Sequence, residues 1–183
     1  NGIGLNLSLV GSYGTYGWSK SVTVSGNYAY AAVYTDGLLI VNIEDPTNPT
    51  LAGSYDTDGL AYDVTILGNY AYVADGDNGL VILNIEDPTN PTLTGSYDTD
   101  GDGVSIDVPI TGNYAYVGDG VNDLVIVNIE DPSNPTLAGN YILANHAQRV
   151  AISGNYVYIT DGTSGLVIFR LSVILGNWLV PDS

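Results

Sequence analysis

The sequence predicts an all-β fold, a β-propeller-like repeat of four four-stranded blades of about 42 residues with one surplus N-terminal outer strand. The motif Gly-Asn-Tyr-x-Tyr recurs at spacings of 42, 44 and 42 residues, beginning at Gly26, Gly68, Gly112 and Gly154. The motif Ile-Glu-Asp-Pro-(Thr/Ser)-Asn-Pro-Thr recurs at spacings of 42 and 44, beginning at Ile43, Ile85 and Ile129. Apolar residues between these motifs follow a period of two, which is typical of strands. Both markers therefore agree on the length of a propeller blade, ~40 to 45 residues.

Each unit carries the signals of four strands, and they are clearest in the second unit. Its strands are expected at residues 63–67, 70–74, 80–85 and 92–97. Gly, Asp, Asn and Pro fill the breaks between them, and these residues either tolerate positive φ or cannot continue a ladder. We assign the chain, residues 1–183, to a single repeat domain whose units span approximately 21–55, 63–97, 107–141 and 149–179.

Both ends of the chain resemble the last strand of a unit. The segment 7–13 ends in Gly-Ser-Tyr, as do the fourth strands of the first two units, and the segment 173–178 aligns with the same strand. One outer strand is therefore surplus. An unpaired apolar strand either frays, lies on its own blade, or is added to the sheet of another chain. For the last case the expected assembly residues are Leu7, Leu9, Tyr13, Val173, Leu175 and Trp178.

A run of apolar residues in each unit gives a family resemblance. The runs are Leu38-Leu39-Ile40-Val41, Leu80-Val81-Ile82-Leu83, Leu124-Val125-Ile126-Val127 and Leu166-Val167-Ile168-Phe169. With the Asn-Ile-Glu-Asp-Pro segment that follows the first three, they resemble the LVIVD repeat of bacterial and archaeal surface β-propellers. The resemblance covers residues 11–179 and implies a propeller on or outside the cell, often within a larger surface protein, without a catalytic motif. The fourth unit departs from the pattern because it lacks the Glu-Asp-Pro loop, and four units are few for such a propeller.

Composition excludes several classes of partner. Three basic residues against 20 acidic ones give a net charge of −17, which opposes binding to nucleic acid and to anionic membranes. No apolar run reaches the ~20 residues of a spanning helix, so membrane insertion is not expected. A chain that begins at Asn1 and contains no Met is expected to be a processed form or a fragment. Together with the acidic, Lys-poor composition, this predicts an extracellular or cell-surface location.

An acidic segment in the middle of the chain suggests one metal site. Residues 98–103 have the form Asp-x-Asp-x-Asp-Gly, in which alternate carboxylates can converge on calcium, and a fourth carboxylate follows closely. The candidate ligands are Asp98, Asp100, Asp102 and Asp107. The twelfth position of an EF-hand falls on Pro109, so only a shortened loop site fits. The alternative is that these residues form Asx turns and that no cofactor is bound.

The remaining polar residues gather on one predicted face of the propeller. Trp18, Lys20, His146 and Arg149 lie in the junctions before the innermost strands and are candidates for a ligand pocket at the channel mouth. No spacing there specifies a reaction. Aspartates in the middle hairpins are expected to form a solvated acidic rim, at Asp36, Asp75, Asp77, Asp119, Asp123 and Asp161.

These observations favour a non-enzymatic scaffold whose partner is another protein or a copy of itself. Adhesion or a surface filament is the expected outcome, with β-strand addition by residues 7–13 or 173–178 as the mechanism. One alternative is a ligand-binding or hydrolytic propeller with its pocket at the channel mouth. Another is half of an eight-bladed dimeric ring, since an open array of four repeats leaves unburied faces.

Overall fold

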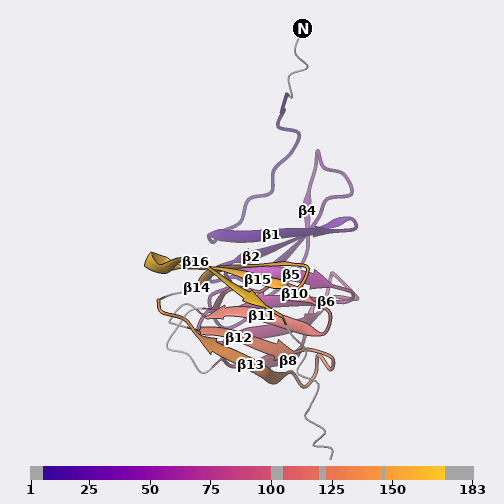
Figure 1. The fold of residues 1–183 in the computed structure, drawn as a ribbon. Coiled ribbons are helices and arrows are strands. Elements are labelled where there is room, and N and C mark those ends of the chain that lie inside the picture. The colour runs from indigo at the N-terminus through magenta and orange to yellow at the C-terminus, as the bar shows by residue number, and fades with distance from the viewer. Residues whose placement is uncertain (1–5, 100–104, 120–122, 146, 172–183) are drawn as a thin grey trace, which may run out of the picture.

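The structure is a computed structural model that describes residues 6–99, 105–119, 123–145 and 147–171. It shows four antiparallel blades arranged as a β-propeller, with one short 3₁₀ helix, Gly162–Ser164, as the helical element of this part of the chain (Figure 1). The predicted fold class is confirmed. No helix among the described residues is long and apolar enough to cross a membrane.

Blades 1 and 2 each have four strands that pair in sequence order. Blade 1 contains β1 (Ser19–Ser25), β2 (Tyr28–Val33), β3 (Gly37–Asn42) and β4 (Thr50–Tyr55). Blade 2 contains β5 (Asp63–Leu67), β6 (Tyr70–Ala74), β7 (Leu80–Asn84) and β8 (Thr92–Tyr97). The regularly spaced Gly-Asn motif forms the turn between the first two strands of each of these blades, where Gly26 and Gly68 have φ of 57° and 59°. Positive φ at these turns explains why each unit carries glycine there.

Blades 3 and 4 depart from this regular pattern. Blade 3 contains β9 (Ser105–Asp107), β10 (Ile110–Thr111), β11 (Tyr114–Asp119), β12 (Asp123–Asn128) and β13 (Thr136–Ile142). Both β9 and β10 pair with β11, so together they form one inner strand, interrupted where Pro109 has no N–H to donate. In the described residues, blade 4 contains β14 (Ala147–Ser153), β15 (Tyr156–Asp161) and β16 (Gly165–Arg170).

Two strands are predicted at the ends of the chain, over residues 7–13 and 173–178. Residues 6–15 are not a strand, which corrects the expected outer strand over Leu7–Tyr13. The physical reason is that no strand of the described chain pairs with this segment, and a strand requires a neighbour for its backbone groups. The other predicted strand, over Val173–Trp178, lies outside the described residues.

Three hydrophobic cores join the four blades. Each blade has two faces: the leading face points toward the next blade in the chain, and the trailing face points toward the preceding blade. Each core forms between the leading face of one blade and the trailing face of the next. Tyr30, Leu38 and Ile40 on the leading face of blade 1 thus pack with Val64 and Val73 on the trailing face of blade 2. Among the described residues, the cores connect blades 1 and 2, 2 and 3, and 3 and 4.

Candidate assembly surfaces and channel mouth

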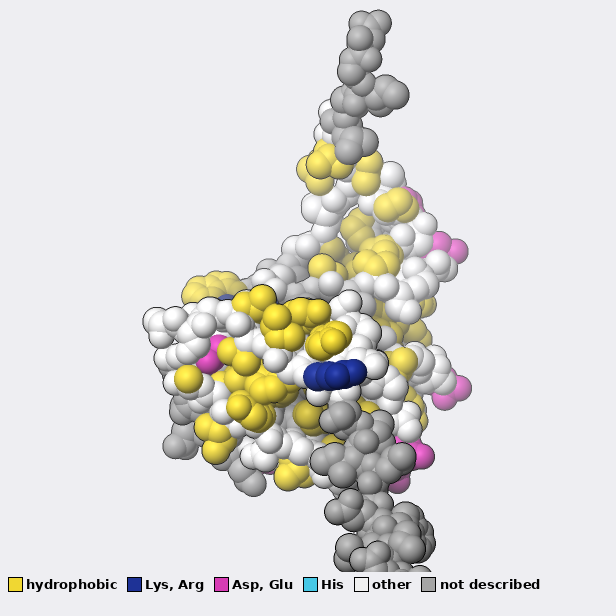
Figure 2. All heavy atoms as spheres, in the orientation of Figure 1, with side chains coloured by type: hydrophobic (Ala, Val, Ile, Leu, Met, Phe, Trp, Pro, Cys, Tyr) yellow, Lys and Arg dark blue, Asp and Glu magenta, His cyan; other side chains and the backbone are white. Residues whose placement is uncertain are grey.

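The leading face of blade 4 is exposed although its sequence repeats that of a buried face. Leu166 is 60% exposed, whereas the equivalent Leu38, Leu80 and Leu124 are at most 2% exposed. Ile168 is 54% exposed, whereas the equivalent Ile40 and Ile82 are fully buried. Figure 2 shows hydrophobic side chains gathered on the surface over β14–β16. Blade 4 therefore presents the side chains of an inter-blade core to solvent.

The trailing face of blade 1 is the complementary case. Val22 is 64% exposed, whereas the equivalent Val64, Val108 and Val150 are at most 6% exposed. Val24, two residues further along β1, is also exposed. The first and last blades thus each expose one apolar face. The exposed face of blade 1 is equivalent to the trailing side of the internal cores, and that of blade 4 is equivalent to their leading side.

The N-terminal segment takes the place of an outer strand next to blade 1. Gly53 of β4 lies so close to Pro88 and Pro91 of blade 2 that a Cβ would collide with the Pro88 carbonyl oxygen. Gly95 of β8 has the same relation to Pro132 and Pro135 of blade 3. Gly11 has this relation to Pro46 and Pro49 of blade 1, and Figure 1 shows the segment lying beside the loop before β4. Residues 6–13 therefore stand where a preceding blade would place its fourth strand.

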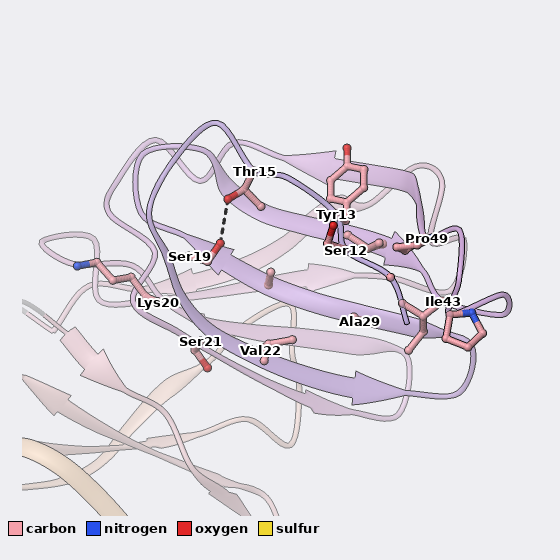
Figure 3. Close-up of a pocket in the computed structure, with 14 residues that line it drawn as sticks. Ser12, Tyr13, Thr15, Ser19, Lys20, Ser21, Val22, Ala29, Ile43 and Pro49 are labelled. Carbon is pink, nitrogen blue, oxygen red and sulfur yellow. Dashed lines mark hydrogen bonds between the residues drawn. The ribbon is translucent and has the colours of Figure 1, made fainter. Parts of the chain in front are cut away.

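A cavity of about 580 Å³ lies between this segment and the sheet of blade 1. Gly11, Ser12 and Tyr13 line one side of it, and Val22, Ala29, Ala31, Val41 and Ile43 line the other. Figure 3 shows the segment crossing over the sheet, with Thr15 hydrogen-bonded to Ser19 over 3.0 Å. The cavity is open and largely apolar, so it suits side chains of another blade.

A chain of polar contacts runs from blade to blade along the innermost strands. Ser21, Asp63, Asp107 and Arg149 hold the same position in the four units. The Ser21 hydroxyl donates to Asp63 over 2.5 Å, and Asp63 accepts the Val108 N–H over 3.1 Å. Asp107 accepts the Val150 N–H over 2.5 Å, and its other oxygen lies 3.7 Å from the Arg149 guanidinium. These side chains connect the first strands of successive blades.

The environment of Asp107 favours its neutral form. Burial is the largest of the effects that raise the pKa of Asp107 to about 7, and the neighbouring Asp63 carboxyl acts in the same direction. The Val150 N–H and the Arg149 guanidinium act in the opposite direction, because both stabilise the ionised carboxylate. Desolvation is the largest effect, so Asp107 retains its proton at mildly acidic pH.

The candidate ligand-pocket residues separate into different contacts. The Lys20 ammonium lies 5.2, 4.8 and 5.6 Å from the ring centres of Trp18, Tyr34 and Tyr62. Cation–π attraction thus holds Lys20 between the first junction and blade 2. Arg149 instead contacts Asp107, and His146 lies outside the described residues. Trp18 and Lys20 are brought together, while Arg149 belongs to the polar chain at the channel.

The candidate calcium ligands are only partly described. Asp100 and Asp102 lie outside the described residues, and Asp107 is engaged with Val150 and Arg149. Asp98 belongs to the loop that follows β8. Where the chain is described, no group of three or more metal-ligating side chains is found.

The expected acidic rim is wrong at three positions. Asp75, Asp119 and Asp161 occupy one repeat position and are almost completely buried. Asp75 accepts hydrogen bonds from the Thr57 hydroxyl over 2.5 Å and from the Asn78 amide over 3.0 Å. Asp161 accepts the Asn145 N–H over 3.0 Å. At Asp75 and Asp161, the carboxylate turns inward because the junction before its blade supplies donors.

Sequence reasoning missed Tyr34, Tyr62 and the contact between Asp63 and Asp107. The polar chain had a detectable signal, since its members recur at the same repeat position as the first inward residue of each blade. The aromatic cluster had none, because Tyr34 and Tyr62 come from different blades and meet edge to face at 5.4 Å only in the folded structure.

Comparison with solved structures supports the fold. A computationally designed protein, Ika4, matches with a TM-score of 0.74 and 10% identity over 92% of this chain and 100% of its own. The periplasmic gluconolactonase PpgL of Pseudomonas aeruginosa matches with a TM-score of 0.74 and 13% identity over 87% of this chain and 55% of its own. The β-propeller domain of Myceliophteria thermophila Cps50 (Swd1) matches with a TM-score of 0.67 and 12% identity over 90% and 56%. The chain thus spans about half the length of the two natural propellers.

Comparison by sequence gives the family. No curated protein matches the chain. The family model described as the LVIVD repeat matches four times, at residues 16–57, 58–99, 102–142 and 144–172. These matches cover most of the chain and fall on the four blades, so the chain belongs to the LVIVD-repeat family.

Proposed function

We propose that the chain is a non-enzymatic, extracellular or cell-surface scaffold that assembles with copies of itself through its two open blade faces. One observation carries the proposal: the exposed leading face of blade 4 and trailing face of blade 1 repeat the two sides of the three internal cores. A core-type face left in solvent is an interaction site. The complementary face is present on every copy of the chain.

The contact between copies is head to tail. Leu166 and Ile168 of one copy would pack on Val22 and Val24 of the next, as Leu38 and Ile40 pack on blade 2. Fully burying one such side chain contributes at most about 1.5–3 kcal/mol, so these four side chains supply the main apolar contribution to the joint. Such a heterologous interface forms a ring if the rotation closes and a filament if it does not.

Location and biological role are supported by composition and family. An acidic chain with three basic residues and no cysteine remains soluble outside the cell and has no disulfides to maintain. The LVIVD resemblance also points to surface propellers. A scaffold of this kind serves adhesion or surface structure. The polar side chains of the innermost strands fit this role, because their contacts join one blade to the next.

The test is the mass of the native particle for two matched variants. Leu166→Asp places a charge in the joint and should raise the dissociation constant at least about tenfold, since each 1.4 kcal/mol is tenfold. Leu93→Asp is the control, because Leu93 is similarly exposed, at 54%, but lies in blade 2 away from both open faces. Light scattering over a concentration series measures both.

The proposal makes opposite predictions for the two variants. Wild type and Leu93→Asp should assemble, and Leu166→Asp should remain monomeric. A wild-type chain that is monomeric at every concentration, or assembly that tolerates Leu166→Asp, contradicts the proposal.

A further inference from the structure

We infer that the rings of Trp18, Tyr34 and Tyr62 form a binding site for an organic cation with a quaternary ammonium group, and that Lys20 occupies this site when no ligand is bound. The three rings are here called the aromatic cage. The inference goes beyond the proposed assembly and does not depend on it.

The first argument is the residue that blade 1 places at one turn. Tyr34 stands where the other three units have glycine, at Gly76, Gly120 and Gly162. The turn has positive φ, 21° at Tyr34 and 57° at Gly76, which glycine adopts readily and tyrosine does not. A hydrogen bond from the Ala61 N–H to the Tyr34 carbonyl, over 2.8 Å, holds Tyr34 in this conformation. A strained residue at a turn that glycine would form without strain indicates a role for its ring.

Trp18 also replaces a smaller residue of the repeat. The second unit has Leu60 at this position, and a Cβ on Gly76 would lie 3.2 Å from the Leu60 Cβ. Blade 2 therefore closes this place with a leucine against a glycine. Blade 1 has two rings there instead, and the centres of Trp18 and Tyr34 are 6.0 Å apart.

The second argument is the size of the cage. The Lys20 nitrogen lies 5.2, 4.8 and 5.6 Å from the three ring centres. A methyl carbon is bonded to nitrogen at about 1.45 Å and contacts a ring carbon at about 3.5–4.0 Å. A methylated ammonium therefore fills a cage of these dimensions, whereas the hydrogens of a primary ammonium leave a gap. Quaternary ammonium ions are the ligands that aromatic cages recognise best.

The third argument is that Lys20 can be displaced. Trp18 is 73% exposed and Lys20 is also exposed, so the cage is open to solvent. Within the described residues no ion pair holds the Lys20 side chain. Figure 3 shows this side chain directed away from the other residues that line the cavity beside blade 1. Cation–π attraction alone is weak at an exposed site, so a cation that fits the rings more closely can take the place of the lysine.

The charges around the cage also favour a cation. Burial is the largest of the effects that raise the pKa of Tyr62 to about 12, and the Asp77 carboxylate acts in the same direction. Tyr62 therefore remains neutral near pH 7. On the other side, a Cβ on Gly17, the residue before Trp18, would lie 3.0 Å from the Asp36 carboxylate. Carboxylates on both sides raise the local concentration of cations.

Choline and dimethylbutanol, its uncharged carbon isostere, are the probes that test the site, and isothermal titration calorimetry measures both. The isostere should bind at least about fivefold more weakly than choline, because it has no cation–π attraction. Lys20→Gln places in blade 1 the residue that unit 4 has at this position, Gln148. This variant should bind choline about two- to fivefold more tightly than wild type, because the competing ammonium is removed. Arg170→Gln is the matched control, since it removes the same charge from blade 4, and it should bind choline as wild type does.

Tyr34→Gly separates a ligand site from a purely structural cluster. The variant restores the glycine of the other units and removes one ring of the cage. Choline binding should fall at least about fivefold. The melting temperature should not fall, because the relief of backbone strain offsets the lost edge-to-face contact with Tyr62. Trp18→Leu, which restores the residue of unit 2, should weaken choline binding in the same way.

Three results overturn the inference. They are equal binding of choline and its isostere, choline binding that survives both Tyr34→Gly and Trp18→Leu, and the absence of saturable binding to Lys20→Gln. A Tyr34→Gly variant that melts earlier but binds choline unchanged would also overturn it, by giving the rings a structural role only. Once choline binding is established, co-sedimentation with phosphatidylcholine vesicles distinguishes a lipid head group from a soluble cation as the source of the ammonium.

Discussion

At the scale of single residues, the buried carboxyl of Asp107 makes stability depend on pH. Its pKa of about 7 is above the ordinary value of 3.8, chiefly because of burial. The folded state therefore binds the proton more tightly than the unfolded state. The stabilisation is fully present below about pH 4 and is lost as the pH rises through about 7.

Asp107→Asn tests this effect. The amide oxygen can still accept the Val150 N–H, while the amide nitrogen can donate to Asp63 and no charge is buried. The variant should lose less melting temperature than wild type between about pH 5 and about pH 8, and should be the more stable of the two at the higher pH. Thermal unfolding followed by circular dichroism measures both. Asp45→Asn, at an exposed turn, should keep the wild-type slope, and an unchanged slope in Asp107→Asn would show that Asp107 does not titrate in this range.

At the scale of elements, the outer strands are held by close contact between a glycine and the proline loop of the next blade. Gly53→Ala should destabilise the chain by about 1–3 kcal/mol, because the new methyl group meets the Pro88 carbonyl. Gly139→Ala is the matched control, since no atom of the described residues lies within 4 Å of a Cβ there and the fourth unit lacks the Glu-Asp-Pro sequence. Urea denaturation measures the difference. Equal losses in the two variants would show that the proline loops do not position the strands.

The elements themselves follow closely from the sequence. The second blade has strands at Asp63–Leu67, Tyr70–Ala74, Leu80–Asn84 and Thr92–Tyr97, and the third of these ends one residue before its predicted end. Such agreement is possible because glycine turns and Glu-Asp-Pro loops are local signals. The Asp75 carboxylate could not be placed in this way, because its burial depends on the Thr57 hydroxyl, which another part of the chain supplies.

At the scale of the whole molecule, the open faces could not be read from the repeat. Val22 and Val64 occupy the same position and have the same side chain, yet one is exposed and the other is buried. The difference lies in whether a blade precedes them, which is a property of the array and not of the residue. Local patterns in a sequence therefore predict the blades well and ring closure poorly.

The whole-molecule charge predicts how assembly responds to salt. Two copies that each carry a charge of −17 repel one another, and the Debye length falls from about 30 Å at 0.01 M to about 8 Å at 0.15 M ionic strength. The dissociation constant should therefore fall about tenfold over this range, as sedimentation velocity can measure. Leu166→Asp should stay monomeric throughout. Assembly that weakens as salt is added would indicate that ion pairs, and not apolar faces, hold the copies together.

The exposed leading face of blade 4 has a consequence for how the proposed assembly depends on concentration. A blade that has a neighbour on one side only is the least stable unit of a linear array, and in the proposed assembly another chain supplies its missing support. Its folding is then governed by mass action, so dilution loosens the last blade and local accumulation consolidates it. The proposed assembly thereby makes the stability of the last blade a function of the protein's own concentration, with the blade fully supported only where many copies gather.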